Sequence, residues 1–218
     1  MESEDEVNED EVLHSLLRHD LRNKLQVAIG YLQLLKDMDL PKEQKDFVKK
    51  SLKSLRDGNK LIEKVRTIRG VSEKEVNSVE VGKFIKRAIE ESRKLSYNNI
   101  SINYDEESCK VKGGPLLEHL FFNLISNSIK HADCDRIEIN VNRNEEVCIV
   151  SVKDDGIGIP PKLQEELFEI GSKGGENAGY GLGLHLVEKI VDHYEGEIKI
   201  KRSDDGGSQF DVILNKVS

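Results

Sequence analysis

The spacing of apolar residues divides the chain into a helical part and a mixed part. Over residues 12–36, apolar side chains recur every three or four positions, which predicts an amphipathic helix with a coiled-coil-like seam. Residues 39–41 (DLP) mark a turn, and a second periodic segment covers residues 48–70. Because a two-helix hairpin buries little surface, we expect two copies to pair into a four-helix bundle, which makes the chain a homodimer.

Beyond residue 70 the pattern changes. The polar, aperiodic stretch VSEKEVNS at 71–78 predicts a short linker. Helical patterns then cover residues 81–95, 116–129 and 182–191, and strand patterns cover 100–102, 137–141, 147–152, 198–200 and 210–214. Helices and strands do not alternate strictly, which favours an α+β sandwich with a mixed, mainly antiparallel sheet over a doubly wound fold. We therefore predict two domains, residues 1–70 and 71–218.

Composition narrows the classes of partner. The 218 residues carry a formal charge of −8, which disfavours nucleic acid or an anionic membrane as the main partner. No apolar run reaches the roughly 18 residues that a membrane helix needs, so we expect a cytoplasmic chain without a membrane segment. The odd number of cysteines, 3, predicts a reducing compartment and unpaired thiols that fill the core.

A histidine stands out in the first helix. At about 100° per residue, His19 lies about 160° and Asn23 about 200° from the apolar seam, so both face solvent. An exposed neutral imidazole is a competent nucleophile, and the neighbouring Asp20 can fix its tautomer or accept its proton. Asn23 is placed to position a water molecule or a phosphoryl group. Taken alone, the segment HDLRN also fits a solvated helix face that happens to carry a histidine.

Polar residues interrupt the apolar helix of the segment NLISNSIKHA. Asn123 and Asn127 lie one turn apart, and Lys130 and His131 follow on the same helix. An amide oxygen is a suitable ligand for Mg²⁺, and a lysine can neutralise phosphate charge. The alternative is an amphipathic helix whose wet face contains asparagines.

Two glycine-containing segments follow. In DDGIGIP the glycines permit a close backbone approach, and a buried Asp154 carboxylate can accept a hydrogen bond from an exocyclic amine such as that of adenine. A hairpin turn is the alternative. The segment GSKGGENAGYGLGL opens into a helix, and its amides, with Lys173, suit a phosphate cradle, whereas a disordered surface loop is the other interpretation. Its spacing matches neither a P-loop nor a dinucleotide fingerprint.

In this order, HDLRN, NLISNSIKHA, DDGIGIP, LFEIG and GYGLGL closely resemble the phosphoacceptor, asparagine, first glycine, phenylalanine and second glycine boxes of sensor histidine kinases. The hairpin resembles the dimerisation and phosphotransfer domain, and residues 71–218 resemble the GHKL-type ATP-binding domain. The commonest phosphoacceptor box has a proline where this chain has Lys24, so no proline kink is expected in the first helix.

The resemblance implies a role for each matched residue. His19 would be the phosphorylated residue, Asp20 its general base or tautomer-fixing partner, and Asn23 a residue for phosphatase activity toward a regulator. Asn127 would hold Mg²⁺, and Asp154 would bind the adenine amine. The remaining nucleotide-binding residues would be Asn123, Lys130, His131, Gly156, Gly158, Lys173, Gly179, Gly181, Leu182 and Gly183.

The implied activity is that of a protein-histidine kinase, which uses ATP and Mg²⁺ to phosphorylate its own histidine and passes the phosphoryl group to an aspartate of a response regulator. One alternative is a serine protein kinase of the anti-sigma-factor type, which shares the ATP-binding boxes and would not need an exposed His19. A second alternative is a non-catalytic phosphotransfer scaffold, which the intact Asn127, Asp154 and glycines oppose.

Overall fold

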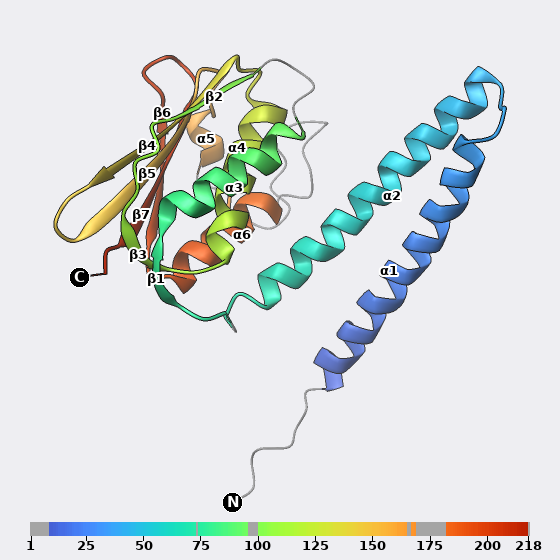
Figure 1. Cartoon of the computed structure of the whole chain (residues 1–218), viewed down its shortest axis with the longest axis horizontal. Helices are drawn as coiled ribbons and strands as arrows, with labels where there is room; N and C mark the ends of the chain where they lie inside the picture. Colours follow the sequence, from blue (N-terminus) through green and yellow to red (C-terminus); the bar gives the residue numbers. More distant parts are fainter. Residues whose placement is uncertain (1–8, 73, 96–99, 165–166, 169–181, 218) are drawn as a thin grey trace, which may run out of the picture. The chain divides into compact units, whose positions relative to one another are not determined.

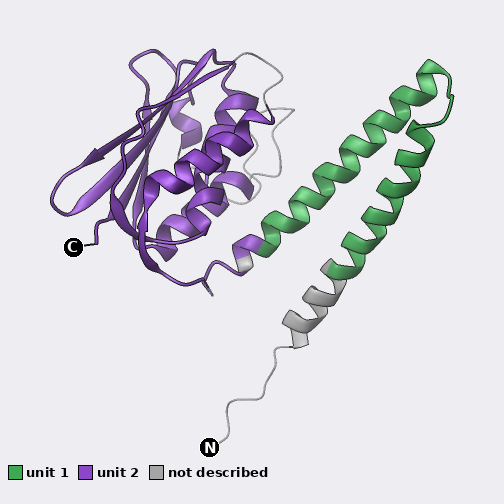
Figure 2. Ribbon diagram, viewed as in Figure 1, with its two compact units in different colours: residues 1–66 green, residues 67–218 purple. Residues whose placement is uncertain are grey.

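The computed structural model describes residues 9–72, 74–95, 100–164, 167–168 and 182–217. The chain divides into two compact units, residues 1–66 and 67–218 (Figure 2). The first unit is a helical hairpin, and the second combines helices with sheets (Figure 1). The predicted fold class, a hairpin followed by an α/β sandwich, is confirmed, and the boundary between the units falls shortly before residue 70.

The hairpin consists of α1 (Glu9–Lys36) and α2 (Lys42–Arg69). Helix α1 runs without a break through Lys24, as expected without a proline. The Pro41 carbonyl accepts a hydrogen bond of 3.0 Å from the Lys45 amide and begins α2. The apolar core between the helices is small and contains Ile29, Val48 and Leu52, with Leu32, Leu40 and Leu55 packed against them.

The second unit contains the following elements: β1 (Asn77–Glu80), α3 (Val81–Arg93), β2 (Ser101–Tyr104), β3 (Lys110–Gly113), α4 (Leu116–His131), β4 (Arg136–Arg143), β5 (Val147–Asp154), α5 (Pro161–Gln164), α6 (Leu182–His193), β6 (Glu197–Arg202) and β7 (Ser208–Asn215). Five strands form a sheet in the order β2-β4-β5-β7-β6, and β1 pairs with β3 in a separate two-stranded sheet. Only the β2–β4 pair is parallel within the five-stranded sheet, so the sheet is mixed and mainly antiparallel, as predicted.

The two faces of the five-stranded sheet differ in chemistry. Helices α3, α4 and α6 lie over one face (Figure 1), where alternate residues such as Ile139, Val150 and Val212 are buried. The residues between them, such as Asn140 and Ser151, point to the other face and are mostly polar. The core therefore lies between the helices and one side of the sheet, and Asp154 at the end of β5 is on the side of the sheet that faces α4.

Three short elements were missed by the sequence patterns: the strands β1 and β3 and the four-residue helix α5. Strand β1 begins at Asn77, inside the stretch predicted to be a linker, and Val71 in that stretch is only 3% exposed because it packs on the core of the second unit. Strand β3, four residues long, was not predicted either. A strand of four residues carries at most two inward-facing positions, too few for a recognisable alternation.

The prediction for the cysteines was wrong for two of the three. Cys109 and Cys148 form a disulfide, with 6.5 Å between their Cα atoms, and both are buried. Cys134 is a free, buried thiol, as predicted. The odd number of cysteines was a poor guide, because it says nothing about which cysteines the fold brings together. Cys109 directly precedes β3, and Cys148 lies on the central strand β5.

Candidate functional site

His19 lies on the exposed face of α1, as the helical geometry predicted. Its side chain is 72% exposed and that of Asp20 is 73% exposed. The Nδ1 atom of His19 lies 3.6 Å from Asp20 Oδ1 and 3.3 Å from Asn23 Nδ2. With both neighbours on the Nδ1 side, the other ring nitrogen, Nε2, faces away from them and is the one available to a reactant. The three residues singled out on the first helix are thus brought together.

Helix α4 positions the asparagines. Asn123 is 3% exposed and donates from Nδ2 to the His119 carbonyl oxygen at 2.7 Å, while its buried Oδ1 has no hydrogen-bond partner within the described residues. Asn127, one turn on, is partly exposed, and Lys130 and His131 are exposed at the end of the helix. Exposed positions suit groups that contact a soluble ligand, and the orphaned amide oxygen of Asn123, one turn before Asn127, is a feature that a hard cation or its water shell can satisfy.

Asp154 is the centre of a buried hydrogen-bond cluster. This residue ends β5 and is 2% exposed. Its Oδ2 accepts hydrogen bonds from the hydroxyls of Ser128, at 3.0 Å, and Ser208, at 2.7 Å. Its Oδ1 accepts from the backbone amides of Ser208, at 3.0 Å, and Gly156, at 3.2 Å. Such a buried carboxylate, held by donors alone, is suited to recognise a donor on a ligand that takes the place of one of them.

Sequence reasoning missed Ser128 and Ser208. Ser128 directly follows Asn127 but lies on the buried side of α4, where its exposure is 4%. Ser208 begins β7 after two glycines. A signal for Ser128 was available, since a hydroxyl on the apolar side of a helix needs a partner. No sequence signal pairs Ser208 with Asp154, because they are brought together only by the pairing of β5 with β7.

The glycines beside Asp154 are required by close backbone packing. A Cβ atom at Gly156 would lie 2.7 Å from the Ala132 carbonyl carbon, and one at Gly207 would lie 2.6 Å from the Gly156 nitrogen. Gly158 has a φ of 72°, a left-handed conformation that glycine adopts without strain. The close approach expected of this loop therefore occurs toward α4 and toward the turn before β7.

Part of the second glycine segment lies outside the described residues, including Lys173, Gly179 and Gly181. Leu182 and Gly183 form the first turn of α6 and are partly exposed. His185 on the next turn, which the sequence reasoning missed, has its Nδ1 3.0 Å from the carbonyl oxygen of Phe168. This contact ties the phenylalanine segment to the start of α6.

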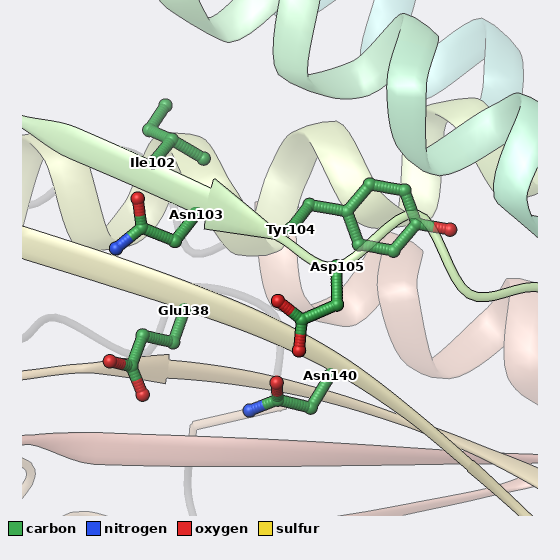
Figure 3. Close-up of a pocket in the computed structure, with 6 residues that line it drawn as sticks. All are labelled: Ile102, Asn103, Tyr104, Asp105, Glu138 and Asn140. Atoms are coloured by element: carbon green, nitrogen blue, oxygen red, sulfur yellow. The ribbon is translucent and has the colours of Figure 1, made fainter.

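A separate groove of 610 Å³ lies at the β2–β4 edge of the sheet. Asn103, Asp105, Glu138 and Asn140 project to the same side of the two strands (Figure 3). Because carboxylates line this groove and repel phosphate groups, it does not suit a nucleotide. The cluster around Asp154 and α4 remains the candidate nucleotide site.

Two family models match the chain. The His Kinase A (phospho-acceptor) domain matches residues 14–69, and the histidine kinase-, DNA gyrase B-, and HSP90-like ATPase matches residues 114–218. The first model covers the hairpin with His19, and the second covers α4, Asp154 and α6. The chain therefore carries a phosphoacceptor domain followed by an ATPase domain of the histidine kinase type.

Curated relatives agree with this assignment. The sensor histidine kinase RcsC of Escherichia coli K12 is 29% identical over 221 residues, which cover 90% of this chain and 22% of the relative. The histidine protein kinase SaeS of Staphylococcus aureus is 32% identical over 109 residues, 46% of this chain and 31% of the relative. The chain thus spans less than a third of the length of these relatives.

Solved structures share the fold. Full-length ShkA in complex with AMPPNP superposes with a TM-score of 0.74 at 19% identity, over 94% of this chain and 46% of that one. The catalytic domain of histidine kinase ThkA superposes with a TM-score of 0.56 at 25% identity, over 66% of this chain and the whole of that domain, 100%. Within the described residues, no helix has the length and apolar character that a bilayer crossing requires.

Proposed function

We propose that this chain is the catalytic core of a sensor histidine kinase that autophosphorylates His19 and transfers the phosphoryl group to an aspartate of a response regulator. The observation that carries the proposal is the combination, in one chain, of an exposed histidine flanked by Asp20 and Asn23 with a buried carboxylate, Asp154, in an ATPase-type domain. A serine kinase of the anti-sigma-factor type would need only the second of these features.

In this proposal ATP binds between Asp154 and the exposed end of α4. Asp154 accepts the exocyclic amine of adenine, while Lys130 and His131 contact the phosphates. Mg²⁺ would be held through the amide oxygen of Asn127 and would neutralise phosphate charge. The orphaned Oδ1 of Asn123 supports this placement, because it lies one turn away and lacks a partner among the described residues.

The transfer to His19 requires a neutral imidazole with a free lone pair on Nε2. This lone pair forms the bond to the γ-phosphorus, the bond between that phosphorus and the β,γ-bridging oxygen breaks, and ADP leaves. The Asn23 amide nitrogen, 3.3 Å from Nδ1, can only donate, so Asn23 must turn away from Nδ1 before the Nδ1–H tautomer forms. Asp20, 3.6 Å from Nδ1, is placed to accept that N–H and to stabilise the positive charge that forms on the ring. In the second step a regulator aspartate attacks the phosphorus and releases neutral His19.

The proposal includes two protein partners. Exposed apolar side chains on the hairpin, among them Leu21 and Leu35, support pairing of two copies into a four-helix bundle. A receiver domain would dock below His19, near Val27 and Tyr31, and Asn23 would position a water molecule for dephosphorylation of the regulator. We place the activity in the cytoplasm because its substrate, ATP, is supplied there, although a disulfide such as Cys109–Cys148 is rare in that reducing compartment.

Autophosphorylation with γ-labelled ATP and Mg²⁺ tests the proposal. We expect acid-labile, base-stable label on the wild-type chain, and at least a hundredfold less on His19→Gln and on Asn127→Ala. His19→Gln should still bind nucleotide, since it leaves the second unit intact. Acid-stable label, or label that survives His19→Gln, would instead indicate a kinase for hydroxyl groups. Nucleotide binding without any label would indicate a phosphatase or a kinase that acts only on a partner.

A further inference from the structure

The Asp154 carboxylate has no acceptor position left for a ligand. A carboxylate accepts about four hydrogen bonds. Four are already made: two hydroxyls, from Ser128 and Ser208, bind Oδ2, and two backbone amides, from Ser208 and Gly156, bind Oδ1. An amine that is to bind Asp154 must therefore replace one of these donors or share its position.

The two backbone donors are fixed by their surroundings. The loop that carries the Gly156 amide is held to α4 by a hydrogen bond of 2.8 Å from the Ile157 amide to the Ala132 carbonyl oxygen. The Ser208 amide belongs to β7, which pairs with β5 up to Lys153, the residue before Asp154. Removal of either amide from Asp154 would require the backbone to move. The donor that leaves Asp154 when the amine binds must therefore be one of the two hydroxyls.

The hydroxyl of Ser128 is the easier one to displace. Its hydrogen bond to Oδ2 is 3.0 Å long, against 2.7 Å for that of Ser208. Ser128 lies within α4, where a serine hydroxyl can rotate to the carbonyl oxygen of the residue four positions earlier, here Leu124. Ser208 lies in a strand and has no such carbonyl on its own element. Ser128 thus has a second partner within reach of a side-chain rotation.

We propose that the Ser128 hydroxyl is an internal competitor of the adenine amine, which it keeps from Asp154 until nucleotide displaces it. This inference rests on the proposed function, because it takes Asp154 as the adenine acceptor. In the empty site Ser128 satisfies a buried charge that would otherwise be short of a donor. When nucleotide binds, the amine takes over that position. Ser128 is therefore a positioning residue that weakens nucleotide binding.

The sign of the effect distinguishes this role from a structural one. Ser128→Ala removes a buried hydrogen bond, which would weaken binding if Ser128 only shaped the pocket. If Ser128 competes with adenine, the substitution opens an acceptor position, and ADP should bind about five- to tenfold more tightly. Ser126→Ala is a matched control, because Ser126 is also buried on the same helix and its hydroxyl donates to the Asn123 carbonyl oxygen rather than to Asp154.

The test is calorimetric titration of the full chain with Mg²⁺ and either ADP or purine riboside 5′-diphosphate, which lacks the exocyclic amine. The quantity compared is the ratio of the affinity for ADP to the affinity for purine riboside 5′-diphosphate. In wild-type protein this ratio should be only slightly above one, whereas in Ser128→Ala it should increase about fivefold or more. Ser126→Ala should keep the wild-type ratio. An unchanged or smaller ratio in Ser128→Ala would overturn the inference.

Two further variants keep the outcomes separate. If Ser128→Ala does not fold, Ser128→Cys, which retains a weak donor, should show a smaller increase in the same ratio, and no increase would overturn the inference. Asp154→Asn tests the underlying assignment. If Asp154→Asn binds ADP as the wild type does, adenine binds elsewhere and the proposed site is wrong. If it loses binding while Ser128→Ala is unchanged, only the competitor role fails.

Discussion

The helical hairpin and the ATP-binding unit differ in where their apolar side chains lie. In the ATP-binding unit, large residues such as Phe121, Ile139 and Leu214 are almost completely buried. In the hairpin, the buried apolar side chains among those described are Ile29, Val48 and Leu52, and exposed ones include Leu21, Val27, Tyr31, Leu34, Leu35, Met38 and Phe47. A unit that buries its apolar residues is stable alone, whereas one that displays them gains stability and function from partners.

Two phenylalanines test this difference most strongly. Phe121 on α4 is fully buried, while Phe47 on α2 is 60% exposed. Phe121→Ala should lower the free energy of unfolding of the ATP-binding unit by about 3–5 kcal/mol, through lost burial and a cavity. Phe47→Ala should change hairpin stability by about 0.5 kcal/mol or less. Differential scanning calorimetry of the full chain would measure both.

The outcome also reports on the dimer. If Phe47→Ala lowers the hairpin transition by several kcal/mol in a concentration-dependent way, Phe47 is buried between two copies, and the hairpin owes its stability to pairing. If Phe121→Ala and Phe47→Ala destabilise the chain equally at all protein concentrations, the two units do not differ in how they bury their apolar side chains.

The disulfide provides the second test, because it belongs to the ATP-binding unit alone. Cys109 and Cys148 are 39 residues apart in sequence, and opening a loop of this size should lower stability by about 2–4 kcal/mol. Thermal unfolding with and without reductant would measure this. The transition of the hairpin should not move.

Thiol counting controls that experiment. Burial, with the nearby Asp154 charge second, raises the pKa of the Cys134 thiol to about 11, so alkylation must be done in denaturant. One labelled thiol before reduction and three after are expected from the 3 cysteines. Three labelled thiols before reduction would mean that the disulfide is absent.

The smallest effect on stability is expected at the proposed docking surface. Val27 and Tyr31 are 59% and 67% exposed, so their substitution by alanine should change the free energy of unfolding by about 0.5 kcal/mol or less. Transfer of label from His19 to a receiver domain should nonetheless slow by about tenfold or more, as for residues at the centre of an interface. Rapid-quench assays would measure the transfer.

Met38→Ala is the control for docking, since Met38 is 57% exposed but lies at the hairpin turn, away from His19. Its transfer rate should match that of the wild type. Wild-type transfer rates for Val27→Ala and Tyr31→Ala would exclude this surface as the docking site.

The fold was predictable where periodicity extends over many residues. The hairpin, α4, α6 and the long strands β4, β5 and β7 all follow from apolar spacing, because each element must bury one face. The short strands β1 and β3 could not be predicted, since pairing with each other, rather than local pattern, defines them. The disulfide was likewise invisible, because it depends on which strands the fold places side by side.

The candidate site was predictable as far as its motifs are local. The geometry around His19 follows from one helix, and Asp154 was expected to be buried. The donors that surround Asp154 come from α4, the loop after β5 and the start of β7, and only the tertiary fold brings Ser128 and Ser208 to the same oxygen. Roles for Lys173, Gly179 and Gly181 remain predictions, because these residues lie outside the described part of the chain.

The attachment of the Asp154 loop to α4 has a consequence for how a nucleotide is measured. Ser128 bonds Asp154, and the Ala132 carbonyl accepts from the Ile157 amide, so two hydrogen bonds join the end of β5 and the loop after it to the C-terminal end of α4. Asn127 and Ser128 are consecutive residues of that helix, and in the proposed site Asn127 holds the metal while Ser128 gives up its hydrogen bond to Asp154 when the base binds. The proposed metal site and the proposed base site are therefore both attached to the same turn of α4, and we expect the site to select ligands by the distance between base and phosphates.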